Sequence, residues 1–206
     1  MLMRKLLIIL LFVPMLLFSS CKGPDKIETY LGNVVNNTYE NDFFGMKFQT
    51  PNDWKQVADM KSEIQKSIDE GQKIDIGSLE SLDLYISFKD TSQNQNTFTP
   101  RFLCVADKVG FIKDIKNETQ YLKHVEDTIK TANPEYKIVK EINKVNIAGK
   151  DFYAMETELK IKNFGFVTQK NYCVLHKGYF LNLIFSCQKG ENPKEFENVL
   201  NTLEFY

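Results

Sequence analysis

Histidine, cysteine and acidic side chains are the residues of this sequence from which catalysis or metal binding would first be expected. The two histidines, His124 and His176, lie in no HExxH motif and in no histidine pair. Cys173 and His176 are three residues apart on an expected strand, so they point to opposite faces and cannot pair as nucleophile and base. Glu156 and Glu158 share one strand face, where paired carboxylates could act, but a solvated face with neighbouring lysines is the favoured interpretation.

Other motifs with known chemistry are missing from the sequence. There is no CxxC pair, P-loop, G-x-S-x-G or G-x-G-x-x-G motif. The sequence therefore predicts no catalytic residue, no metal site and no bound cofactor.

Three cysteines fall in expected strands, at Cys104, Cys173 and Cys187. If Lys177-Gly178 is a two-residue hairpin turn, Cys173 and Cys187 project from opposite faces of that hairpin and cannot form a disulfide. We expect all three cysteines to be buried free thiols that pack as small hydrophobic residues.

A polar segment from Lys89 to Arg101 is too long for a tight hairpin turn. Connections of this length are either functional or mobile. The segment contains Phe98 and Arg101, and the only other arginine of the chain is Arg4. Phe98 and Arg101 are therefore the candidate residues for recognising a ligand or partner, and a mobile connector is the alternative.

The N-terminal segment has the pattern of an export signal. Arg4 and Lys5 precede the apolar run Leu6–Leu17, which leads through small residues to Cys21. A helix of this run would be about 18 Å long, shorter than the roughly 30 Å hydrocarbon core of a bilayer. The sequence thus predicts a cleaved signal peptide over 1–20 rather than a permanent membrane span.

The end of this segment, LFSSC over 17–21, resembles the lipobox of bacterial lipoproteins. In that family a small residue precedes a cysteine whose thiol takes a diacylglyceryl group before cleavage. Phe18 departs from the usual leucine but keeps the position apolar. The resemblance implies that Cys21 is lipidated and holds the protein on the outer side of a membrane in the bacterial cell envelope, whereas an incidental thiol after an ordinary signal peptide is the alternative.

The following residues, 21–37, have scattered apolar side chains and no sustained period. We expect a flexible tether there, with a root-mean-square span of about 22 Å. No second linker or repeat follows, which predicts one domain over 38–206.

Within that domain the periodicity alternates between strand and helix types. Strands are expected over 44–48, 82–88, 102–105, 137–147, 152–161, 166–175 and 179–187. Helices are expected over 57–68, from a cap at Asn117 to Pro134, and from a cap at Asn192 with Pro193 in the first turn. The pattern predicts an α+β fold with an antiparallel sheet of about six to seven strands flanked by helices.

The segment YENDFFGMKFQTPNDW over 39–54 resembles the entry of PsbP-like and DcrB-like domains, which bacterial lipoproteins often carry after a lipobox. A strand pair over 145–152, a hairpin over 172–187 and a closing helix over 196–205 are also similar. These are packing motifs, so the resemblance implies a PsbP-like α/β/α sandwich far more than a function. From the residues themselves we expect Gly45 to serve a turn, Pro51 to end a strand and Trp54 to wedge between sheet and helix, with ligand stacking as the alternative role of Trp54.

Composition and net charge exclude some classes of function. The chain has 43% hydrophobic and 26% charged residues, typical of a folded protein, and its formal net charge of −1 gives no field that would attract nucleic acid. We expect a lipid-anchored, non-enzymatic extracytoplasmic accessory or scaffold protein that binds another envelope component. The alternatives are a carrier of a small apolar ligand, which needs an apolar cavity, and an envelope enzyme with a polar cleft near Cys104 or Glu156.

Overall fold

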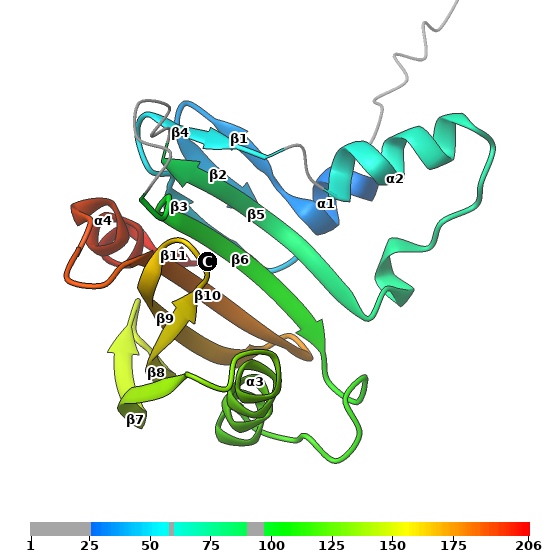
Figure 1. Cartoon of the computed structure of the whole chain (residues 1–206). Helices are drawn as coiled ribbons and strands as arrows, with labels where there is room; N and C mark the ends of the chain where they lie inside the picture. The colour runs from blue at the N-terminus through cyan, green and yellow to red at the C-terminus, as the bar shows by residue number, and fades with distance from the viewer. Residues whose placement is uncertain (1–25, 58–59, 90–96) are drawn as a thin grey trace, which may run out of the picture.

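The computed structural model describes residues 26–57, 60–89 and 97–206 (Figure 1). The strands are β1 (Asn33–Val35), β2 (Thr38–Asn41), β3 (Met46–Gln49), β4 (Trp54–Gln56), β5 (Ser81–Lys89), β6 (Arg101–Lys108), β7 (Lys137–Ile147), β8 (Lys150–Ile161), β9 (Gly165–His176), β10 (Tyr179–Gln188) and β11 (Glu204–Phe205). The helices are α1 (Lys26–Leu31), α2 (Met60–Asp69), the 3-10 helix η1 (Ile76–Ser78), α3 (Glu118–Ala132) and α4 (Lys194–Thr202).

The larger sheet has seven strands in the order β4-β5-β6-β10-β9-β8-β7, and every neighbouring pair is antiparallel. Its central hairpin joins β9 to β10 through Lys177 and Gly178, which both have positive φ, as a tight hairpin turn requires. The expected α+β fold with an antiparallel sheet of this size is confirmed.

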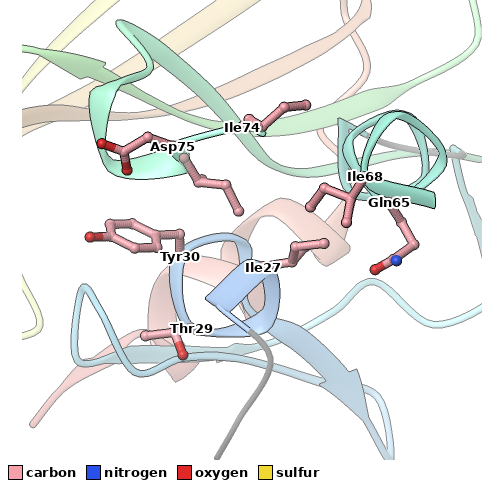
Figure 2. A pocket seen from close by; sticks show the side chains of 8 residues that line it. Ile27, Thr29, Tyr30, Gln65, Ile68, Ile74 and Asp75 are labelled. Carbon is pink, nitrogen blue, oxygen red and sulfur yellow. The ribbon is translucent and has the colours of Figure 1, made fainter. Parts of the chain in front are cut away.

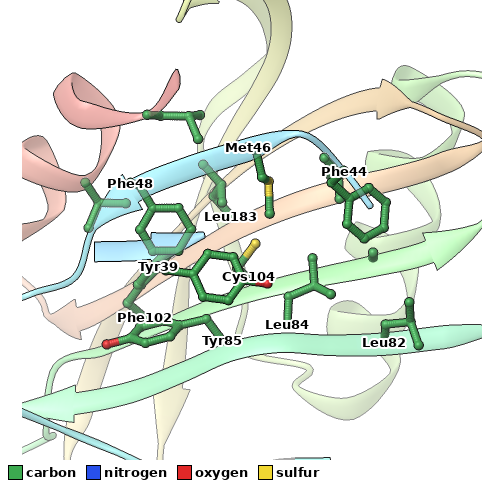
Figure 3. Close-up of a cluster of buried hydrophobic side chains, with 14 of the residues drawn as sticks. Tyr39, Phe44, Met46, Phe48, Leu82, Leu84, Tyr85, Phe102, Cys104 and Leu183 are labelled. Atoms are coloured by element: carbon green, nitrogen blue, oxygen red, sulfur yellow. The ribbon is translucent and has the colours of Figure 1, made fainter. Parts of the chain in front are cut away.

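A second sheet, in the order β1-β2-β3-β11, packs on one face of the larger sheet. Figure 3 shows the aromatic core between them, where Tyr39 and Phe48 of the small sheet meet Tyr85 and Phe102 of the large one. The ring centroids of Phe48 and Phe102 are 5.5 Å apart, and Phe102 stacks on Phe185 at 4.7 Å. Helix α4 extends this layer, because Phe196 packs against both Phe185 and Trp54. The predicted wedge role of Trp54 is confirmed.

On the opposite face of the larger sheet, α3 packs over β8, β9 and β10 (Figure 1). Tyr121 stacks on Phe180 with ring centroids 4.8 Å apart, and Leu122 is fully buried. The helix begins at the predicted cap, where the side-chain oxygen of Asn117 accepts a hydrogen bond from the backbone N–H of Gln120 at 2.9 Å. The molecule is thus layered, with the small sheet and α4 on one face and α3 on the other.

The end of the chain differs from the prediction. Pro193, not Asn192, is the capping residue of α4, and the Asn192 amide donates instead to Glu197. The helix ends at Thr202 rather than continuing to 205. Its last residues turn away because Leu203 is buried and Phe205 pairs with Met46 as part of β11. Gly45 has the predicted turn conformation, with φ of +58°.

The flexible tether expected over 21–37 is wrong for its described part, 26–37. These residues form α1 and the β1–β2 hairpin, and Ile27 and Leu31 belong to the core at 5% and 3% exposure. Gly32 ends α1 with φ of +71°, and a Cβ there would lie 2.5 Å from the Glu40 carbonyl oxygen. The folded part of the chain therefore includes residues upstream of 38.

Candidate ligand-binding cavity

A site with the geometry of a ligand pocket lies beside α1. A helix of six residues is too short to be stable alone, so its position depends on tertiary contacts. Ile27 and Leu31 are four residues apart and face the core together. The terminal carbonyls of the helix are held by β2, since Asn41 donates to the Tyr30 carbonyl and the Tyr39 hydroxyl donates to that of Leu31, each at 2.9 Å. One wall of the pocket is therefore rigidly placed.

The second wall is α2 together with the segment that follows it. Ile64 is the buried residue of α2, whereas Ile68, one turn later, is 36% exposed. The chain then passes Gly71, which has φ of +88°, and returns along Ile74 into η1, where Ile76 is 4% exposed. This return places Ile74 and Ile76 across from Ile68.

The space between these walls is a cavity of about 590 Å³, within the size range of small-molecule sites. Figure 2 shows its lining, in which Ile27 and Ile68 face each other at one side and Tyr30 and Asp75 lie at the other. The residues that line it are Ile27, Thr29, Tyr30, Gln65, Ile68, Ile74, Asp75 and Ile76. The cavity therefore has an apolar side made by isoleucines and a polar side.

The polar side is defined by an aromatic hydroxyl and a carboxylate. The Tyr30 ring is fixed by Phe43, whose ring centroid lies 4.4 Å away. Gly77 lies so close to this ring that a Cβ there would be 2.8 Å from the Tyr30 hydroxyl. The Asp75 side chain is exposed and lines the cavity. A hydroxyl and a carboxylate at one side suit a ligand that carries hydrogen-bond donors at one end.

An ion pair joins the two helices that form the cavity. Lys61 Nζ of α2 lies 3.1 Å from Glu28 Oε1 of α1 and also donates to the Asn33 side chain. Hydrogen bonding to Asn33 and then to Lys61 lowers the pKa of the Glu28 carboxyl from its ordinary value. The charged form of Glu28 thus favours the observed contact between α1 and α2.

Among the described residues, the lining of this cavity includes no cysteine, histidine or serine, so these residues offer no nucleophile or general base of those types. An apolar ligand would remove the isoleucine side chains from water, which is favourable. The largest contribution would come from Ile68, because it is the most exposed of them. The arrangement is that of a binding site for an apolar group.

The recognition residues predicted from the sequence lie elsewhere and differ from each other in exposure. Phe98 is 7% exposed, packs edge to face on Phe164 at 6.1 Å and lies under the Arg101 guanidinium, 5.1 Å from the ring centroid. Arg101 itself is exposed at the start of β6. The Phe98 ring is therefore a platform for Arg101 rather than a free contact surface, and recognition by this pair stays a prediction. Residues 90–96 of the same segment lie outside the described residues.

Cys21, the predicted lipid attachment site, also lies outside the described residues. Cys104, Cys173 and Cys187 are buried and free, as expected. Burial raises the pKa of all three thiols, that of Cys187 to about 11, so each is held as the unreactive neutral form.

His176 and the carboxylates of Glu156 and Glu158 are held by other parts of the protein. His176 Nε2 lies 2.8 Å from the Phe44 carbonyl oxygen, and burial lowers the pKa of its ring. Glu156 and Glu158 bind lysines, with Nζ of Lys140 and Lys189 at 3.2 and 2.9 Å. The hollow next to Glu156 measures about 110 Å³. The expected lysine neighbours are confirmed, but the two glutamate side chains are only 16% and 13% exposed, so the expected solvated face is wrong. In the described part of the chain, Cys104 is fully buried and the hollow at Glu156 is small.

Among the described residues, no group of three or more histidine, cysteine or acidic side chains could hold a metal ion. No helix in the described part of the chain is long and apolar enough to cross a bilayer.

The sequence pattern does not indicate the cavity, because Ile27 and Tyr30 fall in the segment that is predicted to be a tether. A signal was present, since Ile27, Tyr30 and Leu31 have helical spacing and Gly32 follows directly. For Ile74 and Ile76 the alternation is too short to indicate a wall rather than a core contact.

Comparison with known proteins gives a fold but no function. No family model matches the chain, and no curated protein matches it. The solution structure of cyanobacterial PsbP (CyanoP) from Synechocystis sp. PCC 6803 is similar at a TM-score of 0.54, with 11% identity over 85% of this chain and 99% of that one.

Two further solved structures are similar at lower scores. LpqN of Mycobacterium tuberculosis, described as involved in cell envelope biogenesis, has a TM-score of 0.47 and 11% identity over 77% of this chain and 82% of its own. A protein of Bacteroides thetaiotaomicron VPI-5482 has a TM-score of 0.44 and 15% identity over 79% of this chain, which spans 45% of that protein.

The likeness to CyanoP, at a TM-score of 0.54, shows that the fold is PsbP-like.

Proposed function

We propose that this protein is a lipid-anchored, non-enzymatic binding protein of the bacterial cell envelope, and that it holds an apolar ligand in the cavity between α1, α2 and η1. The observation that carries the proposal is the cavity of about 590 Å³ lined by four isoleucines. Of the functions considered from the sequence, the apolar-ligand carrier is the one that requires such a cavity.

The anchor is supported by the sequence alone, through the apolar run and the lipobox-like segment that ends at Cys21. Several buried acyl chains at about 0.8 kcal/mol per methylene make such an anchor stable. Growth with an alkyne fatty acid should label the wild-type protein and a Cys187→Ser control but not Cys21→Ser. Persistent labelling of Cys21→Ser would refute the anchor.

Ligand binding can be tested with an uncharged apolar fluorescent probe, N-phenyl-1-naphthylamine, added to the mature chain. Ile68→Glu places a charge on the exposed wall of the cavity and should weaken probe binding by about tenfold or more. Val139→Glu is the matched control, because Val139 is 45% exposed on β7 and does not line the cavity. Equal probe affinity in the two variants would contradict the assignment of the cavity.

A docking role towards another envelope protein is the second candidate. Its specific observation is Phe111, which is 48% exposed in the connection between β6 and α3. Val109, two residues before Phe111, is 37% exposed and donates its backbone N–H to the Gly178 carbonyl. Chemical cross-linking in intact cells should trap a partner that Phe111→Ser loses, and an unchanged cross-link would exclude this surface.

A further inference from the structure

The cavity lies close to the predicted anchor along the chain. Only four residues, 22–25, separate Cys21 from the start of α1 at Lys26. Even fully extended, the chain from Cys21 to Lys26 spans at most about 18 Å. A flexible tether through residue 37 would have let the domain stand away from the membrane, whereas the fixed helix α1 removes that freedom.

This short connection places the cavity near the lipid surface, because α1 is itself one of the cavity walls. Ile27 lies one residue after the start of α1, is 5% exposed and lines the cavity. The helix cannot swing away from the domain, since its carbonyls are held by Asn41 and Tyr39 of β2. With Cys21 in a bilayer, the nearest abundant apolar molecules are therefore the lipids of that bilayer.

The shape and chemistry of the cavity also fit a lipid. Figure 2 shows Ile27 and Ile68 projecting towards each other, with Tyr30 and Asp75 beyond them at the polar side. An unbranched acyl chain can lie between the isoleucines and cover Ile68, which is otherwise 36% exposed. The head of such a lipid would meet the Asp75 carboxylate and the Tyr30 hydroxyl, which favour hydroxyl or amine donors over a second anion.

We propose that the cavity takes the acyl chain of a membrane lipid whose head carries hydroxyl or amine groups, drawn from the bilayer to which Cys21 anchors the chain. This inference rests on the proposed function and names its ligand class. The polar side of the cavity orients the lipid, and the isoleucine side holds its tail.

The test uses the full chain in growing cells fed a fatty acid that carries both a diazirine and an alkyne. Cells then build the probe into their lipids, and ultraviolet light links each lipid to the protein side chains around it. Tryptic cleavage after Lys61, Lys66 and Lys73 separates the peptide with Ile68 from the peptide that starts at Ile74. Label on Cys21 without light reports the anchor, so only light-dependent adducts on these two peptides report the cavity.

The expected result is a light-dependent adduct with the mass of a complete membrane lipid on the peptides 67–73 and 74–89. Ile68→Glu should lower its yield by about tenfold, whereas Val139→Glu should leave it unchanged. An adduct that joins these peptides to the Cys21 peptide would show the protein's own acyl chain as occupant and overturn the proposal. Absence of adducts, or equal yields in both variants, would also overturn it.

The outcomes separate this inference from the function on which it rests. If N-phenyl-1-naphthylamine binds the wild-type cavity and Ile68→Glu weakens that binding, the binding function stands even where no lipid is cross-linked. In that case the ligand is an apolar molecule other than a membrane lipid, and the assignment of the ligand class is wrong.

Discussion

The helical layer of α3 and the helical layer of α1 and α2 pack on this fold in different ways. Under α3, Leu122 is fully buried and Tyr121 stacks on Phe180, so the space against the sheet is filled. In α2 Ile64 is the buried residue, and Ile68 faces a cavity of about 590 Å³. α3 lies on a broad sheet face, whereas α2 packs on the six-residue helix α1 and on strand β5.

One helical layer of this molecule therefore serves stability, and the other retains an open cavity. A filled layer gains free energy from close packing and loses it when a side chain is shortened. A layer with an open cavity gains little from its exposed isoleucine until a ligand covers that side chain. The following predictions test this contrast.

The largest effect is expected from shortening a side chain in the filled layer. Leu122→Ala should lower the free energy of unfolding by about 3 kcal/mol, because it leaves a cavity under α3. Ile68→Ala should change it by less than about 0.5 kcal/mol, since Ile68 is already partly exposed. Urea denaturation of the two variants measures this, and similar losses in both would contradict the contrast.

A smaller effect is expected at the start of α3. Asn117→Ala removes the acceptor for the Gln120 N–H and should cost about 1 kcal/mol of unfolding free energy. Asn117→Asp keeps an oxygen at the cap and is the control. A loss in the aspartate variant as large as in the alanine variant would show that the cap is not the cause.

At the polar side of the cavity, Gly77→Ala should act on ligand affinity more than on stability. The new Cβ would lie 2.8 Å from the Tyr30 hydroxyl and displace it, which should weaken ligand binding by roughly threefold, the equivalent of one modest hydrogen bond. Titration with dodecyl maltoside, whose head carries hydroxyl groups, below its micelle concentration measures the change. In a Tyr30→Phe background the same substitution should have less effect, and an equal effect would rule out this contact.

The smallest effect concerns pH at the junction of α1 and α2. The pKa of Glu28 is lowered in the folded protein, so its stabilising contribution is complete above the ordinary carboxyl pKa of 4.5 and is lost as the pH falls through the lower folded value. Thermal unfolding between about pH 6 and about pH 3 should show a steeper loss for the wild type than for Glu28→Gln. Parallel curves would mean that the Lys61 contact does not stabilise the junction.

Much of the fold follows from periodicity in the sequence. The strands of the β7–β10 meander were predicted within a few residues, because long alternating segments are bounded by turn residues such as Gly149 and Gly178. The helix cap at Asn117 is also predictable, because Gln120 follows it at the spacing of a capping box. Strand β11 could not be predicted, because a two-residue strand has no period and exists only through its pairing with β3.

The candidate site was much less predictable than the fold. Ile27 and Ile76 come from segments that are far apart in sequence, and only the return of the chain after α2 brings them to one cavity. The long polar segment around Phe98 predicts a recognition residue, yet the Phe98 ring is covered by Phe164 and Arg101. Burial of this kind depends on tertiary contacts that no local pattern encodes.

The central claim, that the cavity binds an apolar ligand while the α3 layer does not, can be measured directly by NMR of isoleucine methyl groups. The mature chain with Cys21→Ser would be titrated with dodecylphosphocholine below its micelle concentration. We predict saturable shifts for the methyl groups of Ile27, Ile68, Ile74 and Ile76, and none for Ile115 and Ile142, which pack under α3. Unshifted cavity isoleucines, or equal shifts in both layers, would contradict the account.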